Sequence, residues 1–169
     1  MTLLGIFFKE PTRKFHLREL SRIMKWGPGR VERNIEKYVK SGIIKKEITK
    51  VVKEYKADTD SESFRSLKLI YTLNILLEAS KDLEKQLLYP EAIVLFGSAS
   101  KGEDIEKGDI DLCVIGNEKE INMKNLEKQL NRKIHLTFLP PKEVANAKKE
   151  FLNNIINGIV LKGYLRVLQ

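Results

Sequence analysis

The sequence has 169 residues, enough for one ordinary domain or two small ones, and a formal net charge of +8. Its single cysteine, Cys113, excludes a disulfide framework or a cysteine zinc site within one chain. The opening apolar run is too short to span a bilayer and has no signal-peptide pattern, so we expect a cytoplasmic protein that does not contact a membrane.

The positive charge is concentrated in the first third of the chain. Residues 1–56 contain 15 lysines and arginines against 6 acidic residues, a net charge of +9, whereas residues 57–169 contain 16 against 17, a net charge of −1. A basic segment beside a nearly neutral one suggests two units, the first of which binds a polyanion such as nucleic acid. A solvated, lysine-rich surface is the alternative interpretation.

Three short helices are predicted before residue 42. Apolar residues 3–8 indicate the first, and Leu17, Leu20, Ile23 and Met24 lie on one face of the second. After the break at residues 27–29, a third helix places Val31, Ile35, Tyr38 and Val39 toward a core. Its outward face carries residues suited to DNA phosphates and base edges: Arg30, Arg33, Asn34, Lys37 and Lys40.

A basic β-hairpin is predicted to follow. Residues 43–56 are rich in β-branched side chains, with the hairpin tip near Thr49 and Lys50. The lysines along it are Lys45, Lys46, Lys50, Lys53 and Lys56. The stretch HLRELSRIMKWGPGRVERNIEKYVKSGIIKKE resembles the winged-helix transcriptional regulators of bacteria and archaea. The resemblance implies that Arg30, Arg33, Asn34, Lys37, Lys45, Lys46 and Lys50 contact duplex DNA. Each of these residues taken alone is also compatible with a solvated surface.

The middle of the chain is predicted to be a connector. Residues 57–63 are polar and typical of a loop, and apolar residues keep helical spacing from Leu67 to Leu88. A homodimer formed through this helix and a helix that packs only on its own chain are both compatible with the pattern. The predicted organisation is therefore a DNA-binding domain at 1–60, a connecting helix at 61–89 and a second domain at 90–169.

The second domain contains two strands with polar residues at adjoining ends. An apolar strand at 91–96 leads into a turn of small residues that begins with Gly97 and Ser98, where backbone N–H groups can approach phosphate oxygens. The next strand begins with Asp109 and Asp111, which project to the same face because side chains alternate along a strand. Two such carboxylates can share divalent metal ions that also bind a substrate's phosphates.

The run FGSASKGEDIEKGDIDLCVIG is similar to the signature of the minimal nucleotidyltransferases in the DNA polymerase β-like superfamily, as is INGIVLKG near the end. The resemblance implies that Gly97, Ser98 and Lys101 bind a nucleoside triphosphate, ATP or another, and that Asp109 and Asp111 bind Mg²⁺ or Mn²⁺. It also implies an α+β fold, with a small mixed sheet and helices on one face. Helices are predicted at 118–130 and over most of 141–157, with a strand at 134–139 between them.

One position departs from the family's pattern. Where the family has a third carboxylate on a later strand, this sequence has His135. Its imidazole can bind a metal or accept a proton as a catalytic group, or it can be a strand residue satisfied by a backbone carbonyl.

Two functions are compatible with the sequence. The first is transfer of a nucleoside monophosphate, AMP from ATP in the simplest case, to a hydroxyl group. By analogy with small family members, the acceptor can be a tyrosine of a toxin-like protein partner. The second is a winged-helix transcriptional regulator whose nucleotidyltransferase domain is weak or inactive and serves for nucleotide sensing or dimerisation.

Overall fold

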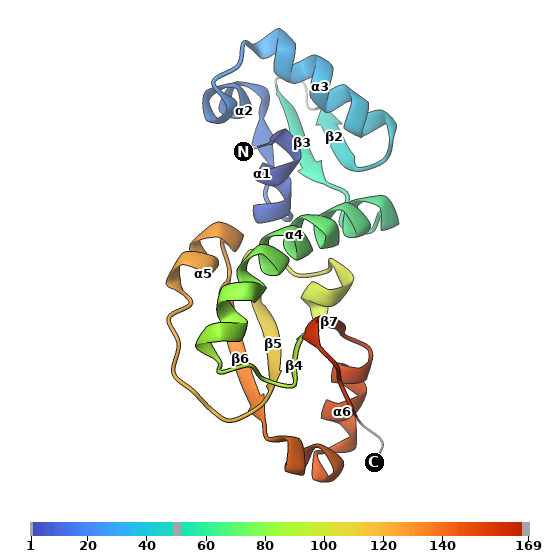
Figure 1. Cartoon of the computed structure of the whole chain (residues 1–169). Coiled ribbons are helices and arrows are strands. Elements are labelled where there is room, and N and C mark those ends of the chain that lie inside the picture. Colours follow the sequence, from blue (N-terminus) through green and yellow to red (C-terminus); the bar gives the residue numbers. More distant parts are fainter. Residues whose placement is uncertain (1, 49–51, 167–169) are drawn as a thin grey trace. The chain divides into compact units, whose positions relative to one another are not determined.

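A computed structural model describes residues 2–48 and 52–166, which form helices and two separate β-sheets (Figure 1). The chain divides into two compact units after Tyr71. None of the helices in the described part of the chain combines the length and the apolar character that crossing a bilayer requires.

The first unit contains three helices and a three-stranded antiparallel sheet of order β1-β3-β2. In chain order its elements are α1 (Leu3–Lys9), β1 (Phe15–His16), α2 (Leu17–Met24), α3 (Pro28–Lys40), β2 (Ile44–Ile48) and β3 (Lys53–Ala57). The three predicted helices and the hairpin are confirmed within the described residues. The predicted hairpin tip at Thr49 and Lys50 lies outside the described residues. β1 was not predicted, because two residues are too few to show an alternating pattern.

Apolar side chains from every element of this unit meet in one core. Val31 and Ile35 are fully buried, as the spacing on the third helix predicts, and Trp26 packs against the same core. Phe7 and Phe15 meet edge to face, with ring centroids 5.2 Å apart. This packing holds α3 with its polar face outward.

The second unit is built on a four-stranded sheet of order β6-β5-β4-β7. β5 (Asp109–Ile115) and β6 (Lys133–Leu139) run parallel, whereas β4 (Ala92–Phe96) pairs antiparallel with β5 and with β7 (Ile159–Gly163). The predicted mixed sheet is therefore confirmed. The helices are α4 (Glu62–Gln86), which begins in the first unit, α5 (Lys124–Leu130) and α6 (Lys149–Ile156), with short 3-10 turns η1 (Ser98–Lys101) and η2 (Pro141–Asn146).

Helices cover both faces of this sheet, so the prediction of helices on one face only is wrong. On one face Phe96 packs edge to face against Phe151 of α6, with ring centroids 5.8 Å apart. On the other face Lys162, which pairs in register with Ile93, forms an ion pair with Glu84 of α4. All five residues of β4 are buried for this reason. An uninterrupted apolar run signals burial of both faces and not of one.

One further prediction is corrected in this unit. The helix predicted at 118–130 begins only at Lys124, whose backbone N–H donates to the Asn122 side chain, so its first half is wrong. Asparagine competes for backbone groups and favours such a start over a continuous helix. Cys113 is buried, and this burial raises the pKa of its thiol to about 11.

Candidate active site

The site begins where the buried strand β4 ends. Gly97, the next residue, has a φ of 70° and a ψ of −155°, a conformation that residues with a side chain rarely adopt. A Cβ atom at this position would lie 2.6 Å from Oδ2 of Asp111. Both the backbone conformation and the contact therefore require glycine, and the main chain lies directly against a carboxylate.

The turn that follows is held together by its own hydrogen bonds. The hydroxyl of Ser100 donates to the carbonyl of Gly97 at 2.7 Å, and the N–H of Glu103 donates to the carbonyl of Ser98 at 3.0 Å. Ala99 and Ser100 are buried, whereas Ser98 and Lys101 are exposed. The turn thus fixes its inner residues and leaves the two side chains predicted to bind a triphosphate accessible to a ligand.

Asp109 and Asp111 lie on the same face of β5, at the end where the strand begins. Asp109 is exposed, and the side chain of Asp111 keeps 30% of its accessible surface. Asp111 is in register with Phe96 on one side and with His135 of β6 on the other. The remaining five residues of β5 are buried, which anchors the strand and fixes where its two carboxylates stand.

His135 on β6 lies beside Asp111 on the neighbouring strand. Its Nδ1 atom lies 3.4 Å from Oδ1 of Asp111, and its side chain keeps 64% of its accessible surface. The structure thus brings together Gly97, Ser98, Asp109, Asp111 and His135, which the sequence predicted as one site. The contact of His135 with Asp111 makes it a neighbour of the carboxylates and not only a strand residue.

The two aspartates fit a divalent cation that also binds a substrate. Mg²⁺ is usually held by one or two carboxylates together with substrate phosphates, so a complete cage of protein ligands is not needed. Among the described residues, no group of three histidine, cysteine, aspartate or glutamate side chains is arranged to hold a metal ion. The carboxylates supply oxygen ligands, and the Gly97 turn leaves room beside Asp111 where a side chain would intrude.

A buried ion pair beside the site was not found by sequence reasoning. Nε of Arg132, directly before β6, lies 3.3 Å from Oδ2 of Asp104, in the loop between η1 and β5. The side chains keep only 2% and 3% of their accessible surface. The pair ties the loop that leads to Asp109 to the start of the neighbouring strand. Nothing in the sequence signals it, because both residues stand in polar segments that are typical of exposed loops.

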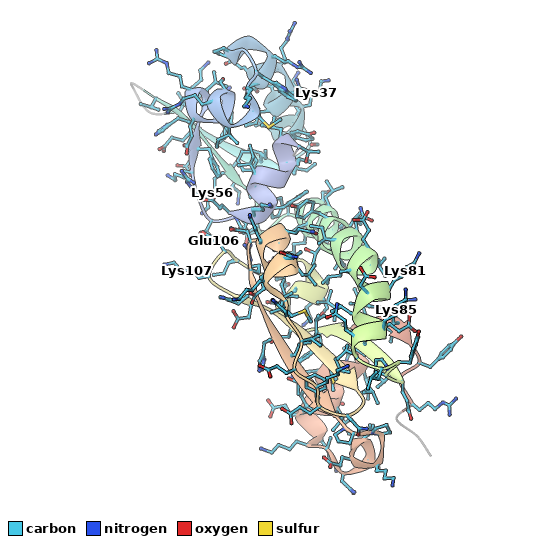
Figure 2. All side chains as sticks on the ribbon, turned by 60° about the vertical axis from the view of Figure 1, so that its left-hand side comes forward. Lys37, Lys56, Lys81, Lys85, Glu106 and Lys107 are labelled. Atoms are coloured by element: carbon cyan, nitrogen blue, oxygen red, sulfur yellow. The ribbon has the colours of Figure 1, made fainter. Side chains whose placement is uncertain are left out.

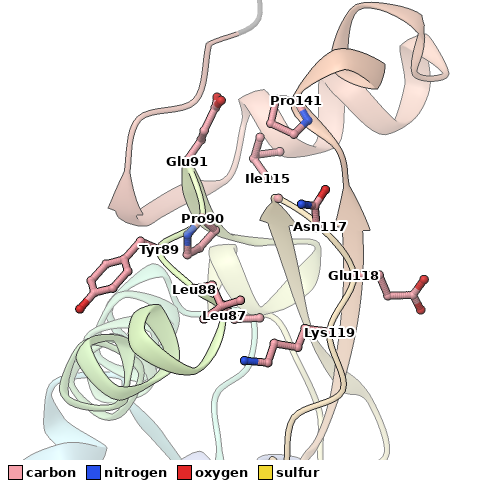
Figure 3. Close-up of a pocket in the computed structure, with 11 residues that line it drawn as sticks. Leu87, Leu88, Tyr89, Pro90, Glu91, Ile115, Asn117, Glu118, Lys119 and Pro141 are labelled. Atoms are coloured by element: carbon pink, nitrogen blue, oxygen red, sulfur yellow. The ribbon is translucent and has the colours of Figure 1, made fainter.

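A separate pocket lies at the other end of β5 and is not part of this site (Figure 3). It has a volume of about 230 Å³ and is lined by residues that include Leu87, Pro90, Ile115 and Pro141. Ile115 is six residues after Asp109 on one extended strand, which corresponds to roughly 20 Å. The pocket is therefore too far from the carboxylates to hold the reacting atoms.

Comparison with known families agrees with this geometry. A family model described as polymerase beta, nucleotidyltransferase matches residues 78–164, about half of the chain. The chain belongs to this family. The match contains Gly97, Ser98, Asp109, Asp111 and His135, and it indicates nucleotidyl transfer as the general activity. Domains of this family generally use nucleoside triphosphates and divalent metal ions. The chain matches no curated protein with significant similarity.

Replacing Gly97 by alanine is expected to lower the free energy of unfolding by about 1–3 kcal/mol, because a non-glycine residue must adopt a rarely populated conformation. It should also displace the Asp111 carboxylate. Urea denaturation of the full chain measures the loss of stability. Gly108→Ala is the matched control, because its Cβ would meet nothing closer than 3.4 Å and its φ is not positive. Equal stability losses in the two variants would contradict this account of Gly97.

Removing one partner of the buried ion pair should cost more than removing both. Asp104→Ala removes the carboxylate that pairs with the buried Arg132 guanidinium and is expected to cost about 3–5 kcal/mol. The double variant Asp104→Leu with Arg132→Met replaces both charges by apolar groups and should lose less stability. A double-mutant cycle by urea denaturation measures the coupling, and purely additive losses would show that the two charges do not interact.

Proposed function

We propose that this protein transfers a nucleoside monophosphate from ATP or another nucleoside triphosphate to a hydroxyl group. The observation that carries the proposal is the contact between the Gly97 backbone and the Asp111 carboxylate, with Asp109 on the same face of the same strand. This arrangement supports the proposal, because a turn of small residues that can bind phosphate lies directly beside two carboxylates that can bind a divalent cation. Family membership supports the same reaction class.

The turn and the carboxylates have separate roles in this proposal. Backbone N–H groups of the turn, the Ser98 hydroxyl and the Lys101 ammonium group bind the triphosphate. Asp109 and Asp111 hold Mg²⁺ or Mn²⁺, which when bound neutralises charge on the triphosphate and on the departing pyrophosphate. The chain itself mainly positions the reacting groups, as phosphoryl transfer requires.

His135 is proposed to accept the proton of the attacking hydroxyl. It stands where the resemblance places a third carboxylate, and its Nδ1 atom lies 3.4 Å from Oδ1 of Asp111, within the predicted site. The alternative is a domain that binds nucleotide but catalyses weakly, because a histidine has replaced the usual carboxylate.

The double variant Asp109→Ala with Asp111→Ala is expected to abolish transfer, because it removes both oxygen ligands. The assay follows labelled nucleotide from α-labelled ATP into an acceptor in the presence of Mg²⁺ or Mn²⁺. Asp82→Ala, which removes an exposed carboxylate of α4, should leave transfer unchanged. Undiminished transfer by the double aspartate variant would reject the proposal.

Substitution of His135 distinguishes an enzyme in which this histidine accepts the proton from a domain that binds nucleotide but catalyses weakly. In an active enzyme, His135→Ala is expected to reduce transfer by roughly 10²–10⁴-fold, the usual contribution of a general base. In a weak enzyme, His135→Ala changes little, and His135→Asp raises transfer by restoring the carboxylate. The same labelled-ATP assay measures both variants.

A second function, DNA binding by the first unit, is favoured by the charges on α3. We propose that this unit is a winged helix-turn-helix, because its helices and its β2–β3 hairpin follow one another in the order that this motif requires. Arg33, Lys37 and Lys40 are exposed, and within the described residues no carboxylate pairs with them. Arg30 stacks over the Trp26 ring at 4.1 Å, which keeps the guanidinium in place at the start of the helix.

The hairpin lysines are less available than those of α3. Lys45 forms ion pairs with Asp58 and Asp60, and the hydrogen bond to Asp58 raises its pKa. Lys46 donates a hydrogen bond to the Glu36 carboxylate, and this bond raises the pKa of Lys46 in the same way. Asn34 donates to the carbonyl of Arg30 at 2.8 Å. We therefore propose α3 as the main DNA-contacting surface. Lys45 and Lys46 contribute once they exchange their carboxylate partners for DNA phosphates.

Replacing Arg33 and Lys37 by alanine is expected to weaken binding to duplex DNA and to reduce its salt dependence. The slope of the logarithm of the binding constant against the logarithm of the salt concentration should fall by about one unit for each phosphate that the protein no longer neutralises. Gel-shift titrations over a series of salt concentrations measure both quantities. Lys81→Ala with Lys85→Ala removes the same charge from exposed residues of α4 and should have little effect. No binding of duplex DNA at low salt would disprove DNA binding.

A further inference from the structure

A buried hydroxyl group in the first unit has no hydrogen-bond partner among residues 2–48 and 52–166. Tyr55, on β3, is fully buried, and its hydroxyl oxygen is enclosed without making a hydrogen bond there. Buried polar groups are nearly always paired, because an unpaired one lowers the stability of the fold. Phenylalanine would fill the same core without this loss, so nothing in the fold of the free protein requires the hydroxyl.

Two ion pairs join α3 to the face of the hairpin that carries this side chain. Lys46 is directly opposite Tyr55 in the sheet, and Lys53 is two residues before it, so all three side chains project to one face. Nζ of Lys46 lies 2.5 Å from Oε1 of Glu36 on α3. Nζ of Lys53 lies 2.9 Å from Oε1 of Glu32, about one helical turn earlier. The tyrosine therefore has a lysine and its carboxylate partner on the same side of the sheet.

The Tyr55 hydroxyl keeps its proton in this position. Burial raises the pKa of the hydroxyl, the nearby Lys46 ammonium group opposes this effect, and the Glu36 carboxylate raises the pKa further. Both charged groups thus act on the hydroxyl through space. At neutral pH the hydroxyl is a hydrogen-bond donor that lacks an acceptor.

Binding of a polyanion would break the pair between Lys46 and Glu36. A DNA phosphate competes with Glu36 for the Lys46 ammonium group, because both present anionic oxygen atoms. The Glu36 side chain keeps 31% of its accessible surface, so water can only partly replace the lysine. Glu36 also stands four residues after Glu32 on α3, where two carboxylates repel each other. Without a new donor, this carboxylate would oppose binding.

We propose that the Tyr55 hydroxyl donates a hydrogen bond to Glu36 when Lys46 leaves that carboxylate for a DNA phosphate. This inference rests on the proposed DNA binding by the first unit. In the free protein Glu36 holds Lys46 and keeps it from phosphates. In the complex the tyrosine replaces the lysine, so the unpaired hydroxyl and the vacated carboxylate satisfy each other. Tyr55 is thus a positioning residue and does not contact DNA itself.

The replacement can be tested without DNA in the full chain. Trp26, the single tryptophan, packs against the core that contains Tyr55, so its fluorescence follows unfolding of this core in urea. Tyr55→Phe alone should leave the urea midpoint unchanged or raise it, because the lost hydroxyl has no partner. In a Lys46→Met background the hydroxyl should already bond to Glu36. There the same Tyr55→Phe substitution should lower the midpoint by roughly 0.5 M.

Lys56→Met provides the matched control background. Lys56 is also a hairpin lysine, but it follows Tyr55 directly in β3 and so projects to the opposite face. Figure 2 shows it well apart from Lys37 of α3. In this background Tyr55→Phe should again leave the midpoint unchanged or raise it. A second control, Tyr38→Phe, removes the hydroxyl of a half-buried tyrosine of α3, and its effect should not depend on Lys46.

The consequence for DNA binding is measured by fluorescence anisotropy with a labelled duplex at low salt. Tyr55→Phe should raise the Kd about threefold to tenfold, which corresponds to the loss of one hydrogen bond. In a Glu36→Ala background, which removes the acceptor, Tyr55→Phe should change the Kd by less than about twofold. The two substitutions thus form a double-mutant cycle that isolates the contact.

Two outcomes would overturn the inference. Equal effects of Tyr55→Phe on the urea midpoint in the unmodified and the Lys46→Met chains would show that the hydroxyl does not respond to loss of the lysine. An unchanged Kd of Tyr55→Phe for a duplex that the unmodified chain binds would show that the contact is absent from the complex. If the unmodified chain binds no duplex while Tyr55→Phe destabilises only the Lys46→Met chain, DNA binding fails and the replacement of Lys46 by Tyr55 stands as a property of the fold.

Discussion

The second unit is organised around the close approach of a glycine backbone to a carboxylate. The antiparallel register of β4 and β5 sets Phe96 opposite Asp111, and a Cβ atom on the next residue, Gly97, would lie 2.6 Å from that carboxylate. The parallel register of β5 and β6 sets His135 on its other side. Because side chains alternate along a strand, a slip of one residue in β5 would turn both aspartates to the opposite face. Sheet register therefore determines whether the site exists.

The same strand contains the most polar and the most buried parts of the unit. Asp109 and Asp111 stand at its open end, where solvent and ligands have access, and the residues from Leu112 to Ile115 are inaccessible. The thiol of Cys113, two residues from Asp111, already has a pKa of about 11 because water is excluded. A charge placed further along β5 would be strongly disfavoured. The site is therefore confined to the first residues of the strand.

Local patterns in the sequence were sufficient to predict much of this arrangement. Small residues after an apolar strand and two aspartates at spacing two depend only on neighbouring residues, and the predicted group from Gly97 to His135 lies together in the structure. The coverage of both sheet faces, the late start of α5 and the short strand β1 depend on contacts between distant segments or on single side-chain hydrogen bonds. The Asp104–Arg132 pair is the clearest example, because 28 positions separate residues whose pairing only the folded sheet brings about.

That pair also limits how the site can change during evolution. A buried charge that loses its partner lowers the stability of the fold. A sequence that has lost only Asp104 or only Arg132 is therefore a destabilised intermediate between sequences with both residues and sequences with neither. Related sequences should therefore keep both residues or have lost both, and their history at these two positions should be correlated. The loop that leads to Asp109 should then keep its shape through a constraint unrelated to chemistry, while exposed neighbours such as Lys107 should be free to diverge.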